Sequence, residues 1–195
     1  MPEGQRPLLS LKNANIAMKQ TELTYVQENA AHNQQIEDIN AEAFGPGRFT
    51  RAAHFIREGG PHDEGLSFVA LDGDTVIASV RLTRITIGST PAVMLGPLAV
   101  RPEFKNRGIG RHLMQMSMDA SKAVGDKLIV LVGDEPYYGP FGFKMIKPGS
   151  VTMPAPVDPR RLLACELREG AMEHVSGVMR YAGHHHTAAL LKKAS

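Results

Sequence analysis

The sequence has a single cysteine, Cys165, among its 195 residues. One cysteine cannot form a disulfide within the chain, which fits a reducing compartment and favours the cytoplasm. No apolar run approaches the roughly 18 to 20 residues that span a bilayer, and the N-terminus has no apolar signal core. We therefore expect a cytoplasmic protein with no membrane partner.

An excess of charge of either sign is also missing. The chain has 22 Lys and Arg residues against 20 Asp and Glu residues, a net charge of +2, so we expect no nucleic-acid partner. Hydrophobic residues at 43% and charged residues at 22% exclude wholesale disorder. The length suits one domain, which we place at 21–182 between a flexible N-terminal extension, 1–20, and a flexible C-terminal tail, 183–195.

The stretch 95–113 changes from a strand pattern to a helix pattern through a basic, glycine-containing turn. Apolar residues alternate up to Val100, and Pro102 ends the strand because proline lacks the N–H that a ladder needs. From Ile109 onward apolar residues recur at helical spacing, so the helix begins near Gly108. A helix N-terminus presents unpaired N–H groups and a partial positive charge, so this turn predicts a phosphate site.

The apolar alternation of this strand slips by one residue at Gly96-Pro97. Glycine within a strand often marks a bulge, and proline cannot donate in a ladder, so we expect the strand to bulge there and diverge from a neighbour. A diverging strand leaves backbone groups free to bind a ligand. A long ligand with amides at one end and phosphates at the other, such as coenzyme A, has the matching layout.

Two motifs, Lys-Asn-Arg-Gly-Ile-Gly at 105–110 and Tyr-Gly-Pro-Phe-Gly-Phe at 138–143, carry a resemblance to a known family. Together they resemble the GNAT superfamily of N-acetyltransferases, whose acetyl-CoA loop follows the pattern Gln/Arg-x-x-Gly-x-Gly/Ala. Lys105 departs from the usual Gln or Arg at a position that acts mostly through its backbone N–H. The resemblance covers roughly residues 21 to 147.

The resemblance implies transfer of an acetyl group from acetyl-CoA, as cosubstrate, to a primary amine by direct attack. It also implies that Tyr138, rather than its neighbour Tyr137, lies beside the acetyl-CoA sulfur and acts as the catalytic acid. With its ordinary pKa near ~10, a tyrosine is protonated at neutral pH. The implied cofactor-binding residues are Leu98, Ala99, Val100, Lys105, Asn106, Arg107, Gly108, Ile109, Gly110 and Arg111.

Two rival phosphate loops are excluded by the residues at the helix start. A P-loop needs Gly-Lys-Ser/Thr where this chain has Gly110-Arg111-His112, and a dinucleotide fingerprint needs a third glycine where Leu113 stands.

The remaining patterns predict an α/β (α+β) fold: a GNAT-like mixed, mostly antiparallel sheet of six to seven strands, with helices on both faces and a splay at the central strand. A hairpin is indicated by Asp72-Gly73-Asp74, and a buried strand parallel to the central one by the apolar run in 127–132. Beyond the central strand and the helix that follows it, the expected elements are strands at 21–26, 66–71, 75–87, 127–132, from 142 and at 162–167, and helices at 33–44 and 49–57.

Several questions stay open at this level. The general base is Glu64, Asp134, Glu135 or His62, or the amine reacts unaided, and the acceptor itself is unknown. A non-catalytic acyl-CoA-binding sensor is the alternative function, and a second copy of the chain is a candidate partner. We expect no metal, because the consecutive histidines 184–186 read as a solvated tail, and we expect Cys165 to be a core residue without a chemical role.

Overall fold

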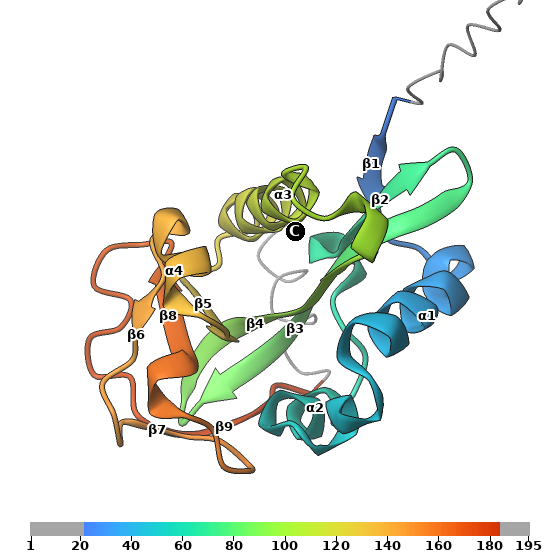
Figure 1. Cartoon of the computed structure of the whole chain (residues 1–195). Helices are drawn as coiled ribbons and strands as arrows, with labels where there is room; N and C mark the ends of the chain where they lie inside the picture. The colour runs from blue at the N-terminus through green and yellow to red at the C-terminus, as the bar shows by residue number, and fades with distance from the viewer. Residues whose placement is uncertain (1–21, 184–195) are drawn as a thin grey trace, which may run out of the picture.

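The computed structural model describes residues 22–183 as one mixed sheet with helices on both faces (Figure 1). The flexible ends that we predict at 1–20 and 183–195 lie outside the described residues, except for Gly183. The strands are β1 Thr24–Gln27, β2 Phe68–Asp72, β3 Thr75–Ile87, β4 Thr90–Val100, β5 Leu128–Val132, β6 Lys144–Met145, β7 Val151–Thr152, β8 Leu162–Glu166 and β9 Gly177–Tyr181. The α-helices are α1 Asn33–Phe44, α2 Ala52–Arg57, α3 Ile109–Ala123 and α4 Glu135–Tyr138.

The sheet follows the order β1-β2-β3-β4-β5-β8-β6, with β9 beside the second half of β3 and β7 beside β9. Neighbours are antiparallel except β4 with β5 and β7 with β9, so the mixed, mostly antiparallel sheet is confirmed. Within residues 22–183 it has nine strands, not six to seven. The strands that we missed are β7 and β9, which are short and bury few side chains, so they show no clear apolar alternation.

The helices divide between the two faces of the sheet. Ile109 and Leu113 of α3 pack in one buried cluster with Ala70 of β2. On α1, Ile36 packs in another cluster with Val69, the residue next to Ala70. Because successive side chains of a strand point to opposite faces, α3 and α1 lie on opposite sides, and the buried side of α2 faces the same way as α1.

The predicted bulge and splay of the central strand are both present. Across β3 and β4, Val80 pairs with Leu98 but Leu82 pairs with Leu95, so β4 carries one extra residue at Gly96-Pro97. On its other side β4 pairs with β5 only as far as Met94, and then runs on to its end without that neighbour. The β4 edge beyond Met94 is therefore open.

One helix boundary differs from our prediction. The helix expected over 49–57 begins as an α-helix only at Ala52, and Phe49 belongs to a 3-10 turn, Pro46–Thr50. Between the two, Arg51 has an extended backbone with ψ of 141°, which interrupts helical hydrogen bonding. The first helix, α1, has the predicted boundaries.

Candidate functional site

The turn before α3 is shaped to bind an anion. Gly108 caps the helix with a left-handed φ of 79°, and no atom beyond its chain neighbours lies within 4 Å of where its Cβ would be. Asn106 also has a positive φ of 61°. The N–H of Lys105 donates to Pro102, but the first N–H groups of α3, starting at Ile109, have no partner within the helix. These N–H groups and the open space at Gly108 make room for a phosphate.

Three cations surround this turn: Lys105, Arg107 and Arg111. All three are exposed, and none has a carboxylate partner among residues 22–183. Arg107 lies over the ring of Phe104 at 5.1 Å, and Arg111 over Phe141 at 5.2 Å. Their charges therefore remain available for an anion at the helix N-terminus.

The backbone of β4 directs specific N–H groups toward the open edge. The N–H of Arg101 donates to Ile77 of β3 at 2.9 Å. Since backbone groups alternate in direction along a strand, the N–H of Ala99 also points to β3, while those of Leu98 and Val100 point away from it. The side chains of Leu98 and Val100 pack beside Gly110, whose Cβ position is 3.9 and 3.4 Å from them, so the strand edge leads to the phosphate-binding turn.

The gap between β4 and β5 forms a cleft of about 520 Å³, which we call the splay cleft. Its walls include Gly96, Pro97 and Leu98 of β4 and Val132 at the end of β5. The cleft opens where the pairing of β4 with β5 has ended. Tyr138 of α4 also lines it.

Tyr138 and Tyr137 occupy different places. A Cβ on Gly133 would lie 2.2 Å from the Tyr138 ring, so the ring rests on a position that only glycine leaves open. Burial raises the pKa of Tyr138 to about 12, helped by Tyr137 and Asp134 and opposed by Arg161. Tyr137 is 39% exposed, and its hydroxyl lies 3.0 Å from the Cβ position of Gly110 at the start of α3. Tyr138 therefore lies at the cleft and Tyr137 at the helix N-terminus.

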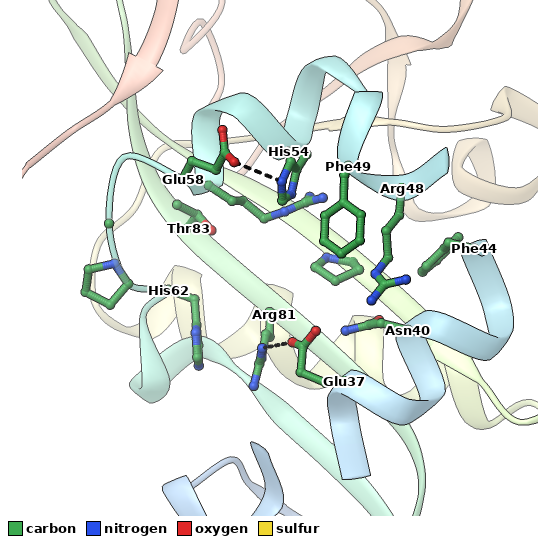
Figure 2. A pocket seen from close by; sticks show the side chains of 14 residues that line it. Glu37, Asn40, Phe44, Arg48, Phe49, His54, Glu58, His62, Arg81 and Thr83 are labelled. Atoms are coloured by element: carbon green, nitrogen blue, oxygen red, sulfur yellow. Dashed lines mark hydrogen bonds and ion pairs between the residues drawn. The ribbon is translucent and has the colours of Figure 1, made fainter. Parts of the chain in front are cut away.

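A second cavity of about 250 Å³, the α1–α2 cavity, adjoins the splay cleft. Figure 2 shows side chains of α1, of the segment around α2 and of β3 converging on it. The two cavities share Phe44, Arg48, Arg57 and Pro97 in their walls, so they meet beside the bulge of β4. A molecule in the α1–α2 cavity would reach the inner end of the splay cleft.

A buried ionic network, which no sequence motif indicates, lies behind the α1–α2 cavity. The Glu28 carboxylate accepts from Arg81 at 2.6 Å and lies 3.0 Å from Nε2 of His62, and Arg81 also contacts Glu37 at 3.1 Å. Burial raises the pKa of Glu28, but the hydrogen bonds from His62 and Arg81 outweigh it, so the net shift is downward. The network fixes His62 in the cavity wall.

The four candidates for the general base fall in different places. His62 lines the α1–α2 cavity and Asp134 the splay cleft, whereas Glu64 and Glu135 line neither. Asp63, between the candidates His62 and Glu64, forms an ion pair with Arg84 at 2.7 Å.

Apart from Nε2 of His62, which faces Glu28, two polar atoms in the wall of the α1–α2 cavity are buried without a hydrogen-bond partner among residues 22–183: Oδ1 of Asn40 and Oγ1 of Thr83. Buried polar atoms are normally paired, so both are suited to accept N–H groups of a ligand. Figure 2 shows Asn40 on α1 and Thr83 on β3.

Cys165 lies in the core rather than at either cavity. Its Sγ is 3.5 Å from the carbonyl oxygen of Phe141, and burial, with a smaller effect of Glu166, raises the pKa of the thiol. A raised pKa keeps the thiol protonated and a poor nucleophile. That it is dispensable stays a prediction.

Among residues 22–183 no three His, Cys, Asp or Glu side chains gather as ligands for a metal ion, and the histidines 184–186 lie outside this range. Over the same residues, none of the helices has the length and apolarity needed to cross a membrane.

Comparison with known sequences gives a family match. The model of the Acetyltransferase (GNAT) family matches residues 33–143. The chain is 26% identical over 137 residues to the uncharacterized N-acetyltransferase YhbS of Escherichia coli strain K12, covering 69% of this chain and 81% of YhbS. It is 25% identical over 163 residues to the uncharacterized N-acetyltransferase YjhQ of the same strain, covering 80% of this chain and 90% of YjhQ.

Comparison with solved structures shows the same fold. The crystal structure of YhbS from Escherichia coli in complex with CoA has a TM-score of 0.70 and 23% identity, covering 84% of this chain and 91% of that one. A GNAT family acetyltransferase from Brucella melitensis in complex with acetyl-CoA has a TM-score of 0.52 and 23% identity, covering 78% of this chain and 99% of that one.

Proposed function

The chain belongs to the acetyltransferase (GNAT) family, and from this premise we propose that it transfers an acetyl group from acetyl-CoA to a primary amine by direct attack. The observation that carries the proposal is the continuity of three features. The open N-terminus of α3 leads along the free N–H groups of β4 into the splay cleft, and this cleft joins the α1–α2 cavity. A second cavity beside the cofactor cleft favours an enzyme over a sensor, because a sensor needs no place for an acceptor.

In this proposal the cosubstrate lies along the open edge of β4. The N-terminus of α3 and the cations Lys105, Arg107 and Arg111 bind its pyrophosphate. The N–H groups of Leu98 and Val100 bind the amides of its pantetheine arm, as an added strand would bind to a free edge. The thioester then lies in the splay cleft near Gly96, where the two cavities meet.

The reaction needs no covalent enzyme intermediate. The neutral amine attacks the thioester carbon, and the N–H of Leu98 stabilises the oxygen that becomes negative. As the C–S bond breaks, Tyr138 donates its O–H toward the departing thiolate. Holding both reactants in adjoining cavities supplies the orientation that a direct transfer requires.

We assign the base to His62, which lines the α1–α2 cavity and whose Nε2 is held by Glu28. Its other nitrogen, Nδ1, can then take the proton that the amine loses. The single cysteine fits a cytoplasmic location, and this location and a homodimer remain predictions.

The first test is turnover itself. Purified protein with acetyl-CoA should release free CoA thiol when a primary amine that fits the cavity is added, and mass spectrometry should find the amine acetylated. A panel of amino acids, alkylamines, peptides and proteins covers the acceptor classes. Tight acetyl-CoA binding without acetylation of any acceptor would favour the sensor instead.

Replacing His62 with Gln should lower kcat/KM for the amine by about tenfold near neutral pH, because the protonated amine then depends on solvent to lose its proton. The deficit should shrink as pH rises toward the pKa of the amine, where the neutral form is already abundant. Steady-state rates from pH 6 to 10 measure this effect, with Glu64→Gln as the control. A deficit that stays constant with pH would assign His62 a structural role.

A further inference from the structure

Arg57 stands where the two cavities meet. It lines both of them, and its Nη1 lies 3.9 Å from the Cβ position of Gly96, the residue at the bulge of β4. Arg57 is half-buried and belongs to the last turn of α2. Its guanidinium is therefore next to the place that we assign to the thioester.

Every carboxylate in the walls of the two cavities is already paired with a basic residue other than Arg57. Glu37 contacts Arg81 at 3.1 Å, and Glu58 contacts His54 at 3.2 Å. The remaining pairs are Asp134 with Arg161 at 3.0 Å and Asp158 with Arg160 at 2.8 Å. None of these carboxylates therefore forms an ion pair with Arg57.

Three arginines of these walls have no carboxylate partner among residues 22–183: Arg48, Arg51 and Arg57. Two of them lie over aromatic rings, Arg48 over Phe49 at 4.1 Å and Arg51 over Phe44 at 5.1 Å. The guanidinium of Arg57 makes no ring contact, hydrogen bond or ion pair with any described residue.

The surroundings of Arg57 are unfavourable for a lone cation. Burial lowers the pKa of Arg57 to about 10. The charges of the neighbouring Arg51 and Arg81 add to this shift to a smaller extent, and that of Glu37 opposes it. It still carries its charge at neutral pH, and the attraction of Glu37 offsets the cost of desolvating that charge only in part. An anion in the cavity would relieve it.

We propose that Arg57 binds an anionic group of the acceptor, a carboxylate or a phosphate, so that the substrate is a small amine that carries its own negative charge. The planar guanidinium suits both groups, because each can take two parallel N–H donors. Arg57 lies beside Gly96, so the anion must be within a few bonds of the attacking nitrogen. Oδ1 of Asn40 and Oγ1 of Thr83 are free to accept N–H groups of the same molecule.

This inference rests on the proposed acetyl transfer, and one experiment separates the two. The probes are matched amines: an α-amino acid and its carboxamide, and an aminoalkylphosphonate and the alkylamine of equal length. The wild-type protein should prefer each amine with an anionic group over the matched amine without one by at least about tenfold in kcat/KM. A higher kcat/KM for the amino acid would indicate a carboxylate site, and a higher kcat/KM for the aminoalkylphosphonate would indicate a phosphate site.

Arg57→Gln should abolish that preference by lowering kcat/KM for the anionic amines alone, with acetyl-CoA affinity unchanged. Arg57→Lys keeps the charge but not the paired donors, and should retain part of the preference. Arg168→Gln is the control, since Arg168 is exposed and lines neither cavity. Removing a half-buried cation without a partner should also leave the melting temperature the same or higher.

The anionic acceptor would be overturned, with acetyl transfer left intact, by equal kcat/KM for amines with and without the anionic group. An equal loss of kcat/KM for both kinds of amine in Arg57→Gln would also overturn it, and would mean that Arg57 acts on the thioester oxygen instead. If no amine is acetylated at all, both proposals fail.

Discussion

Replacing Tyr138 with phenylalanine should lower kcat by roughly ten- to a thousandfold while the affinity for acetyl-CoA stays nearly constant. The substitution removes only the hydroxyl. The ring, which rests on Gly133 and meets Phe143 edge-on at 5.9 Å, keeps its packing. The loss should therefore appear in the chemical step. Stopped-flow or steady-state thiol release, together with calorimetric titration of CoA, measures the two quantities.

The pKa of about 12 defines what Tyr138 does in this step. A raised pKa means that the neutral form is favoured in the folded protein, so the hydroxyl keeps its proton throughout the neutral and moderately alkaline range. The pKa also exceeds that of a thiol, about 8.5, so full proton transfer to the thiolate is uphill and a strong hydrogen bond is the expected contribution. If the activity changes with pH below about pH 11, the change should then come from the titration of another group, and the same pH dependence should persist in Tyr138→Phe.

Tyr137→Phe is the matched control for this prediction. Its hydroxyl lies at the start of α3 rather than in the splay cleft, so its removal should change kcat little. A large loss of kcat in Tyr137→Phe with none in Tyr138→Phe would mean that the tyrosine beside the sulfur is Tyr137, one residue earlier than the motif indicates. If neither change affects kcat, solvent protonates the thiolate and both rings only pack.

Replacing Gly108 with Glu should weaken acetyl-CoA binding by roughly ten- to a hundredfold. The position is open to solvent, with no atom beyond its chain neighbours within 4 Å of its Cβ, so the new carboxylate lies where the pyrophosphate must approach the first N–H groups of α3. Charge-assisted contacts are worth about 1.5 to 3 kcal/mol each, which corresponds to this range when one is lost. Isothermal titration of the folded variant measures the change.

Gly108 has a φ of 79°, so any side chain there is also strained, and the control must share that strain. Gly125, just past the other end of the same helix, has a φ of 86° and equally open surroundings. Gly125→Glu therefore has a similar backbone cost and the same added charge, but far from the N-terminus. It should lower the melting temperature without changing CoA affinity. If both variants bind CoA as the wild type does, the phosphate site lies elsewhere.

The cofactor half of the candidate site is local in sequence. The slip of alternation at Gly96-Pro97, the end of the strand and the helix start at Gly108 each have a physical cause within a few residues. A glycine and a proline disrupt a ladder, and a glycine adopts the left-handed φ that the cap requires. The order of residues along this short stretch is therefore enough to predict the bulge, the splay and the turn.

The acceptor half depends on residues that are far apart in the chain. Arg81 and Glu28 are separated by 53 positions, and neither belongs to a motif. Their pairing follows from the positions of β3 and of the segment after β1 in the sheet. Without the register of these strands, each residue reads as an ordinary exposed charge.

The sequence by itself determined the family, the order of the main elements and the turn at the head of α3, because alternation, caps and glycine conformations act over neighbouring residues. Only the tertiary structure decided which charges have partners. It pairs every acid of the two cavity walls with another basic residue and leaves Arg57, beside Gly96, without an acidic ion-pair partner among residues 22–183. Charge pairing is a long-range property, since it depends on which side chains the sheet topology brings within a few ångströms of each other.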